Sequence, residues 1–201
     1  YQIVRADRNF QRMKMSRGRG VLIAVRCEYT IFELDLSAGF DSLLFTDVVG
    51  VKLVLHHSSV FILAVYIQPK ATVDEYDLLF NLLSSLTELL NQRVILIGDF
   101  DIPEYSPDVS DYGMNKGSVS SLLNFLHYSD YQQFNNISNN INRYLDLVIS
   151  NLNCQIKCSG DNLLNEDPHH PSLFIPVKVC TSQIRVINRN KSSDKQWNFR
   201  K

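Results

Sequence analysis

Apolar and polar residues follow one another along this chain mostly in the short runs that are typical of β-strands. A run rich in Val, Ile, Leu, Phe and Tyr indicates a strand, and a wholly apolar run such as Val21–Val25 favours a buried one. The two runs on either side of Ser58-Ser59 predict a β-hairpin with that pair as its turn. The sequence predicts strands at Val21–Val25, Tyr29–Leu36, Asp47–His57, Val60–Ile67, Val94–Phe100, Tyr144–Ser150 and Ser172–Val179.

Two stretches have the spacing of amphipathic helices instead. Leucines recur at helical spacing after Thr72 and Asp74, so one of these two residues is predicted to cap a helix that runs to about Asn91. A shorter helix is predicted at Ser118–His127, and a loop at Ser37–Ser42. Because a doubly wound parallel fold needs a helix after nearly every strand, the pattern favours an α+β sandwich with packed sheets and helices outside.

The composition fits one globular domain. The chain has 201 residues, of which 45% are hydrophobic and 20% charged, which excludes a wholly disordered, collagen-like or coiled-coil protein. No apolar run is long enough to span a bilayer, and the polar, basic start of the chain lacks the apolar core of a secretory signal. We therefore expect an intracellular protein, nuclear or cytoplasmic, that is neither secreted nor held in a membrane.

The formal net charge of −1 conceals an uneven distribution. Residues 1–26 carry seven Lys or Arg and one acid, and residues 182–201 carry six Lys or Arg and one acid. The segment between them holds seven basic and 19 acidic residues, which gives it a net charge of −12. This distribution fits a protein whose basic ends bind phosphates while its acidic middle segment binds a cation. Two solvated basic tails would have the same composition.

Aspartates occur where the predicted strands end or enter the core. Asp99 and Asp101 directly follow the apolar residues 94–97, which places both at the rim of the sheet. Asp146 lies inside the apolar run 144–150, where a carboxylate is costly unless another group pairs with it. An aspartate after a strand is more often a turn residue or a helix cap, so these aspartates indicate a functional site only when they are considered together.

Three more titratable residues, Asp167, His169 and His170, come just before the last predicted strand. Pairing between an aspartate and a histidine supplies an oriented imidazole, and additional carboxylates supply a site for a hard cation such as Mg²⁺. These groups together indicate metal-assisted hydrolysis of a phosphate ester. Taken singly, a histidine pair before a proline is usually part of a loop, and Tyr66 at the end of its strand usually packs in the core.

The order of the motifs resembles that of the endonuclease/exonuclease/phosphatase superfamily, to which deoxyribonuclease I and the apurinic endonucleases belong. The matching segments are RGRGVLIAV (17–25), VYIQP (65–69), VILIGDFD (94–101), YLDLVIS (144–150) and DPHHPSLFI (167–175). More narrowly, the chain is similar to the endonuclease domain of non-LTR retrotransposons. The resemblance implies a deoxyribonuclease I-like α+β sandwich of two packed mixed sheets with flanking helices.

The resemblance also implies how the chain is divided. Residues 1–180 are expected to form the nuclease domain. The ending QWNFRK (196–201) is similar to the linker that joins such a domain to a reverse transcriptase. We therefore expect residues 181–201 to be a basic linker toward a reverse transcriptase domain of the same polyprotein.

Each candidate residue acquires a role from the same resemblance. Asp99 corresponds to the aspartate that positions or deprotonates the attacking water, Asp146 to the aspartate that orients the catalytic histidine, and His169 to that histidine. Tyr66 corresponds to the tyrosine that hydrogen-bonds the scissile phosphate. The function implied is phosphodiester hydrolysis with Mg²⁺ or Mn²⁺, by which the enzyme nicks DNA for retrotransposon insertion.

The chain departs from the family pattern in three places. It begins after the strands that bear the family's asparagine and its metal-binding glutamate, so we expect the first strands to be missing. Asp101 stands where the family has an asparagine that contacts phosphate. Pro168 separates Asp167, the expected metal ligand, from His169, which makes His170 an alternative catalytic histidine.

These departures leave two functions in competition. The chain is a Mg²⁺-dependent DNA endonuclease, or it is a catalytically impaired remnant of one with at most weak nucleic-acid binding. A phosphatase of the same superfamily, acting on inositol phosphates or lipids, fits the motifs less well.

Overall fold

A six-stranded mixed sheet forms the centre of the computed structural model, which describes residues 1–7, 20–86, 92–107, 117–160 and 167–178. Its strand order is β3-β4-β5-β6-β8-β7. Neighbouring strands run antiparallel except β5 and β6, which are parallel because helix α3 lies between them in the chain. The strands are β3 (Thr30–Glu33), β4 (Thr46–Leu55), β5 (Ser58–Ile67), β6 (Val94–Asp99), β7 (Gln132–Gln133) and β8 (Asp146–Ser150).

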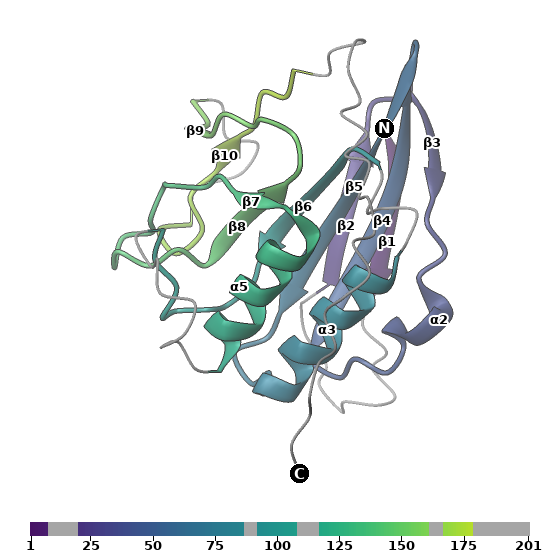
Figure 1. The fold of residues 1–201 in the computed structure, drawn as a ribbon. Helices are drawn as coiled ribbons and strands as arrows, with labels where there is room; N and C mark the ends of the chain where they lie inside the picture. The colour runs from purple at the N-terminus through teal and green to yellow at the C-terminus, as the bar shows by residue number, and fades with distance from the viewer. Residues whose placement is uncertain (8–19, 87–91, 108–116, 161–166, 179–201) are drawn as a thin grey trace, which may run out of the picture.

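Helices α3 (Val73–Ser85) and α5 (Ser118–Ser129) cover one face of this sheet (Figure 1). The apolar stripe predicted for each helix packs on strand residues such as Leu63 and Leu96, and together they form the largest hydrophobic core. A hydrogen bond joins the two helices, from Ser121 Oγ to Asp77 Oδ1 at 2.6 Å.

Two small antiparallel sheets cover the opposite face. They are formed by β1 (Gln2–Asp7) with β2 (Gly20–Val25), and by β9 (Lys157–Cys158) with β10 (Leu173–Phe174). The first pair packs on Val49 and Val51 of the central sheet, and the segments around the second pair pack on Ile95 and Val148. The central sheet is therefore the middle layer between helices and small sheets, which confirms the predicted α+β sandwich (Figure 1).

The predicted hairpin is confirmed, but its turn lies at His56-His57 rather than at Ser58-Ser59. Both serines belong to β5, where Ser58 pairs with Leu55 and Ser59 with Val54. Polar residues on a partly buried strand end are compatible with a ladder, so their polarity alone did not mark the turn. The two imidazoles at the turn stack with their ring centroids 4.9 Å apart.

Other strand predictions need smaller corrections. Val21–Val25 is a strand, but it is not wholly buried, because β2 turns one side outward and leaves Leu22 60% exposed. The last strand shortens to Leu173–Phe174, since Pro176 has no N–H to continue the ladder. Strands β1, β7 and β9 were not predicted. The last two are only two residues long, and polar residues interrupt the apolar ones of β1.

The helical predictions differ from the structure mainly at the ends. The predicted loop Ser37–Ser42 contains a short helix, α2 (Ser37–Phe40). Of the two predicted caps, Thr72 and Asp74, it is Thr72 that precedes helix α3. The helix ends at Ser85, and residues 87–91 of the predicted helix lie outside the described part of the chain. The predicted basic linker, residues 181–201, lies outside it as well.

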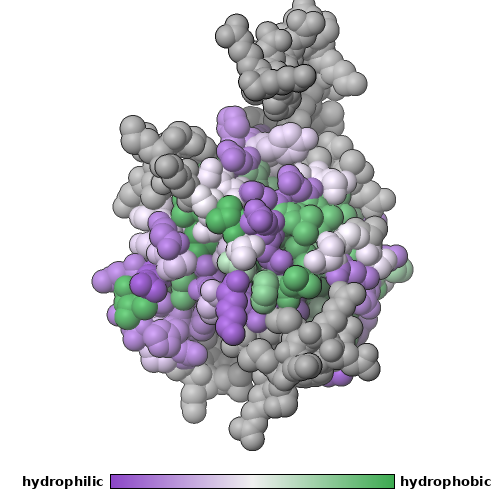
Figure 2. Space-filling model, turned by 90° about the horizontal axis from the view of Figure 1, so that it is seen from below, coloured by the Kyte–Doolittle hydropathy of each residue, from purple (hydrophilic) through white to green (hydrophobic). Residues whose placement is uncertain are grey.

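The described surface mixes hydrophobic and hydrophilic residues. Seen from below, hydrophobic residues gather around the middle of the face, with hydrophilic residues between and around them (Figure 2). Among the described helices, none has the length and apolar character needed to cross a membrane.

Candidate active site

Four polar residues form one row across the central sheet. Asp47 of β4 pairs with Tyr66 of β5, Tyr66 with Asp99 of β6, and Asp99 with Asp146 of β8. Strand residues two apart share a face, so this row lies on the side of Ala64, Ile97 and Val148, which is covered by the small sheets. The row thus lies at the end of the sheet, next to the apolar residues of this face. Three of its members, Tyr66, Asp99 and Asp146, are residues predicted from the sequence.

Gly98 allows β6 to bring Asp99 close to its neighbours. Its backbone lies so near β5 that a Cβ atom added there would lie 1.8 Å from the carbonyl oxygen of Val65. Only glycine fits this approach, which keeps Gly98 paired with both Val65 and Leu147. Asp99 therefore sits between Tyr66 and Asp146 at a fixed register.

A tight turn brings His170 to this row. The amide N–H of His170 donates to the carbonyl oxygen of Asp167 at 2.9 Å, which closes a turn whose second residue is Pro168. Proline is common at the second residue of such a turn, because its ring fixes φ at the value that the turn requires. The turn also sets the directions of the two histidines: His169 is exposed, whereas His170 is partly buried against the sheet.

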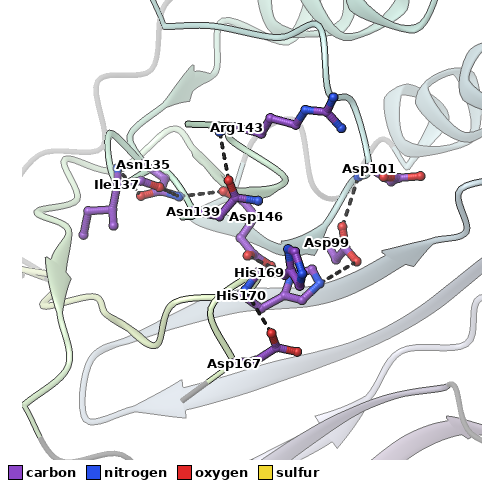
Figure 3. A network of polar contacts seen from close by, with 10 residues as sticks. All are labelled: Asp99, Asp101, Asn135, Ile137, Asn139, Arg143, Asp146, Asp167, His169 and His170. Carbon is purple, nitrogen blue, oxygen red and sulfur yellow. Dashed lines mark hydrogen bonds and ion pairs between the residues drawn. The ribbon is translucent and has the colours of Figure 1, made fainter. Parts of the chain in front are cut away.

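The His170 imidazole lies between two aspartates of the row (Figure 3). Its Nδ1 is 3.0 Å from Asp146 Oδ2 and 3.3 Å from Asp146 Oδ1, and its Nε2 is 3.7 Å from Asp99 Oδ2. The first contact is a hydrogen bond, and the last is too long to be one. Solvent reaches the group, because the His170 side chain is 39% exposed and those of Asp99 and Asp146 are 19% and 22% exposed.

Asp167, His169 and Asp101 lie around this group without a side-chain hydrogen bond to the His170 imidazole. The backbone N–H of His169 donates to Asp167 Oδ1 at 2.9 Å, so the Asp167 carboxylate stabilises its own turn. Asp101 has a positive φ of 45° and donates its N–H to Asp99 Oδ1 at 3.1 Å. Its carbonyl oxygen accepts a hydrogen bond of 2.8 Å from the hydroxyl of Tyr76. Asp101 thus orients Asp99 through its backbone, while its carboxylate lies beside the His170 group.

Burial and like charges shift the pKa values of the group. Burial raises the pKa of Asp99 to about 6, and the carboxylates of Asp146 and Asp101 act in the same direction against the opposing effect of His170. The pKa of Asp146 is also raised by burial. For His170, burial lowers the pKa, but the carboxylates of Asp146, Asp99 and Asp167 outweigh it, so the value is raised. The surrounding carboxylates therefore favour the protonated form of the imidazole.

The same three residues fit a divalent cation. Asp99, Asp146 and His170 each offer a ligand atom, and these atoms all lie within 4.8 Å of one another. Carboxylate oxygens are ligands for Mg²⁺ and Mn²⁺, and an imidazole nitrogen is a ligand for transition ions. The donor set is compatible with a divalent cation and does not select one ion.

Buried asparagines support the group and were not predicted as part of it. Asn135, which is 1% exposed, donates from Nδ2 to the carbonyl oxygen of Asp146 at 2.6 Å and accepts from the N–H of Ile137 at 2.9 Å. It thereby fixes the backbone where β8 begins. The sequence signal was the cluster of asparagines before the run 144–150, because a polar side chain that caps backbone groups is typical of such loops.

The fold places the chain in the class of deoxyribonuclease I-like α+β sandwiches. A structure comparison agrees: the chain is similar to the endonuclease domain of TRAS1, a telomere-specific non-LTR retrotransposon, with a TM-score of 0.57 and 10% sequence identity. The similarity covers 89% of this chain and 80% of that domain. It confirms, at the level of the fold, the resemblance found in the motifs. No family model matches the sequence, and no curated protein matches it.

Proposed function

We propose that the protein is a metal-dependent DNA endonuclease that hydrolyses phosphodiester bonds. The observation that supports this most strongly is the His170 imidazole, which Asp146 holds through Nδ1 while Nε2 faces Asp99. An oriented imidazole beside a carboxylate of raised pKa is what an in-line attack on a phosphodiester requires. The fold shared with a retrotransposon endonuclease domain supports DNA as the substrate and retrotransposon insertion as the setting.

Each residue of the group has a distinct role in this proposal. Asp99, with a pKa of about 6, orients the attacking water and accepts its proton. His170, kept protonated by Asp146, donates from Nε2 to the phosphate oxygen on which negative charge develops. Tyr66, the neighbour of Asp99 in the row, hydrogen-bonds the scissile phosphate. A divalent cation held by these carboxylates would polarise a phosphate oxygen.

The role that the motif resemblance implies for His169 is proposed here for His170, the alternative residue. The support is geometric: the imidazole that contacts Asp146 belongs to His170, whereas His169 is exposed. We do not assign the metal role expected of Asp167, because among the described residues the ligand atoms that lie within 4.8 Å of one another belong to Asp99, Asp146 and His170.

Nicking of supercoiled plasmid in Mg²⁺, in Mn²⁺ and in EDTA tests the proposal. We expect metal-dependent nicking that falls by about 100-fold or more in H170A and stays within a few-fold of wild type in the matched variant H169A. Loss of activity in H169A with H170A active would return the role to His169. Wild-type nicking no faster than that of H170A would contradict the endonuclease and favour an impaired remnant.

A further inference from the structure

The proposed active site carries an excess of negative charge. Asp99, Asp101 and Asp146 lie together. Burial raises the pKa of Asp101, and the nearby carboxylate of Glu104 raises it further. A phosphodiester is itself an anion, so this arrangement repels the backbone of a nucleic acid unless cations offset it. A protein cation beside the site would therefore decide how closely the substrate approaches.

Arg143 is such a cation, and its backbone is held rigidly. Its N–H donates to Asn139 Oδ1 at 2.9 Å, and its carbonyl oxygen accepts from the N–H of Asn139 at the same distance. Asn142, which has a positive φ of 57°, donates its N–H to the carbonyl oxygen of Asn139 at 3.1 Å. The loop 139–143 is thus closed on itself by a single buried asparagine.

This loop is joined at both ends to the elements that carry the proposed catalytic residues. The N–H of Asn140 donates at 3.1 Å to the carbonyl oxygen of Pro168, which belongs to the turn that presents His170. At its other end, the loop leads within three residues to Asp146, the partner of His170. Arg143 therefore keeps a defined position relative to both members of the pair.

The guanidinium group itself is available to a ligand. Arg143 is exposed, and no ion pair joins its guanidinium to a carboxylate within the described part of the chain. Figure 3 shows its side chain extending from the loop toward the side of the site on which Asp101 lies. In agreement with this, its charge works to lower the pKa of Asp101.

We propose that Arg143 binds the phosphodiester backbone of the nucleic acid beside the scissile bond, an inference that rests on the proposed endonuclease function. A guanidinium group offers a planar pair of N–H donors that matches two oxygens of one phosphate. Its charge acts on Asp101, so it lies where it can offset the negative charge of the site. Arg143 would then set the affinity for DNA rather than the rate of bond cleavage.

Binding of a fluorescently labelled short DNA duplex in EDTA, followed by anisotropy over a range of salt concentrations, tests this inference without cleavage. We expect R143Q to weaken binding about fivefold or more and to reduce the slope of log affinity against log salt by about one, with R143K in between. R26Q is the comparison variant, since it removes one exposed arginine charge from the basic segment 1–26, where Arg26 pairs weakly with Glu28 at 3.0 Å, and so measures the general effect of losing one positive charge. Thermal melts of both variants check that the fold is kept.

The outcomes separate this inference from the function on which it rests. Equal affinities for R143Q and R26Q, with wild-type binding and nicking intact, would overturn the role of Arg143 and leave the endonuclease standing. A wild-type chain that neither binds nor nicks DNA would overturn both. In the nicking reaction we expect R143Q to raise KM and to leave kcat within about threefold, whereas a fall in kcat at unchanged KM would contradict a role in binding.

Discussion

His170 Nδ1 lies 3.0 Å from Asp146 Oδ2, although the two residues are 24 positions apart in the chain. The contact depends on two independent local structures: strand β8, which begins at Asp146, and the turn that closes between Asp167 and His170. Because each is fixed by its own backbone hydrogen bonds, the pair is preorganised before any substrate arrives. Preorganised dipoles and charges are the main means by which an enzyme stabilises a developing negative charge.

The pKa of His170 should depend chiefly on Asp146. Burial alone lowers this pKa, and the carboxylates around it raise it above the ordinary value, with Asp146 as the largest contributor. We expect the substitution D146N to lower the pKa of His170 relative to wild type, because the amide removes the negative charge. Titration of the histidine Cε1–H resonances by NMR in EDTA measures this, with H170A to assign the signal. An unchanged pKa in D146N would contradict the pairing.

The stability of the metal-free protein should fall as the pH rises through the range in which Asp99 ionises. The pKa of Asp99 is raised to about 6 in the folded state, so between roughly pH 4 and 6 the folded chain holds more protons than the unfolded chain. Stability from this group is present at low pH and is lost as the pH rises. We expect D99N to stabilise the protein at pH 7.5 by on the order of 2 kcal/mol, and much less at pH 4.

Urea unfolding in EDTA at the two pH values measures this difference. The substitution D77N is a suitable comparison, because Asp77 is exposed on α3, where it accepts a hydrogen bond from Ser121 and has no part in the row. A D99N variant that is less stable than wild type at pH 7.5 would show that the Asp99 charge is compensated by its neighbours. The same variant should have lost nicking activity, which would show that stability and activity compete at this position.

Replacement of Gly98 by alanine should destabilise the fold severely. The new Cβ atom would lie 1.8 Å from the carbonyl oxygen of Val65, and a backbone atom in a central strand cannot move aside cheaply. We expect a loss of more than about 3 kcal/mol or failure to fold. Gly160 gives a matched control, since a Cβ there meets nothing within 4 Å, and G160A should stay within about 0.5 kcal/mol of wild type. Urea unfolding that gives similar midpoints for the two variants would contradict the close approach of β5 and β6.

The sequence predicts the strands and the aspartates of the site for the same reason. Asp99 and Asp146 attract notice because a charge beside or inside an apolar run needs a partner, and the apolar runs themselves predict β6 and β8. The fold class follows from the number of such runs against two helices. These are local signals, which is why they can be predicted without a structure.

The choice between His169 and His170 could not be made from the pattern. The two are adjacent and identical, and the direction of each side chain is decided by the turn that begins at Asp167. Asn135 and Arg143 were missed for a related reason. Asn135 contacts the backbone of Asp146, and the loop that carries Arg143 contacts the turn at Pro168 through Asn140, and sequence spacing reveals neither contact. Strand β1 was overlooked because polar residues interrupt its apolar ones, although Val4 is buried in the structure.

Asp101 is the position at which the effect of a carboxylate can best be compared with that of a neutral amide. Its carboxyl, whose pKa is raised by burial and by Glu104, stands where the motif resemblance implies a neutral amide that contacts phosphate. The substitution D101N keeps the backbone N–H that orients Asp99 and removes one negative charge from the face that the DNA approaches. We expect D101N to bind duplex DNA about threefold or more tightly than wild type, with a smaller gain as salt rises, because screening weakens the repulsion that the charge exerts.

The anisotropy assay in EDTA measures the affinity, and plasmid nicking measures the consequence for catalysis. Faster nicking at low DNA concentration would show that the carboxylate only repels the substrate. Tighter binding in EDTA combined with loss of nicking in Mg²⁺ would instead identify Asp101 as a ligand of the metal, and its charge would then be required rather than tolerated.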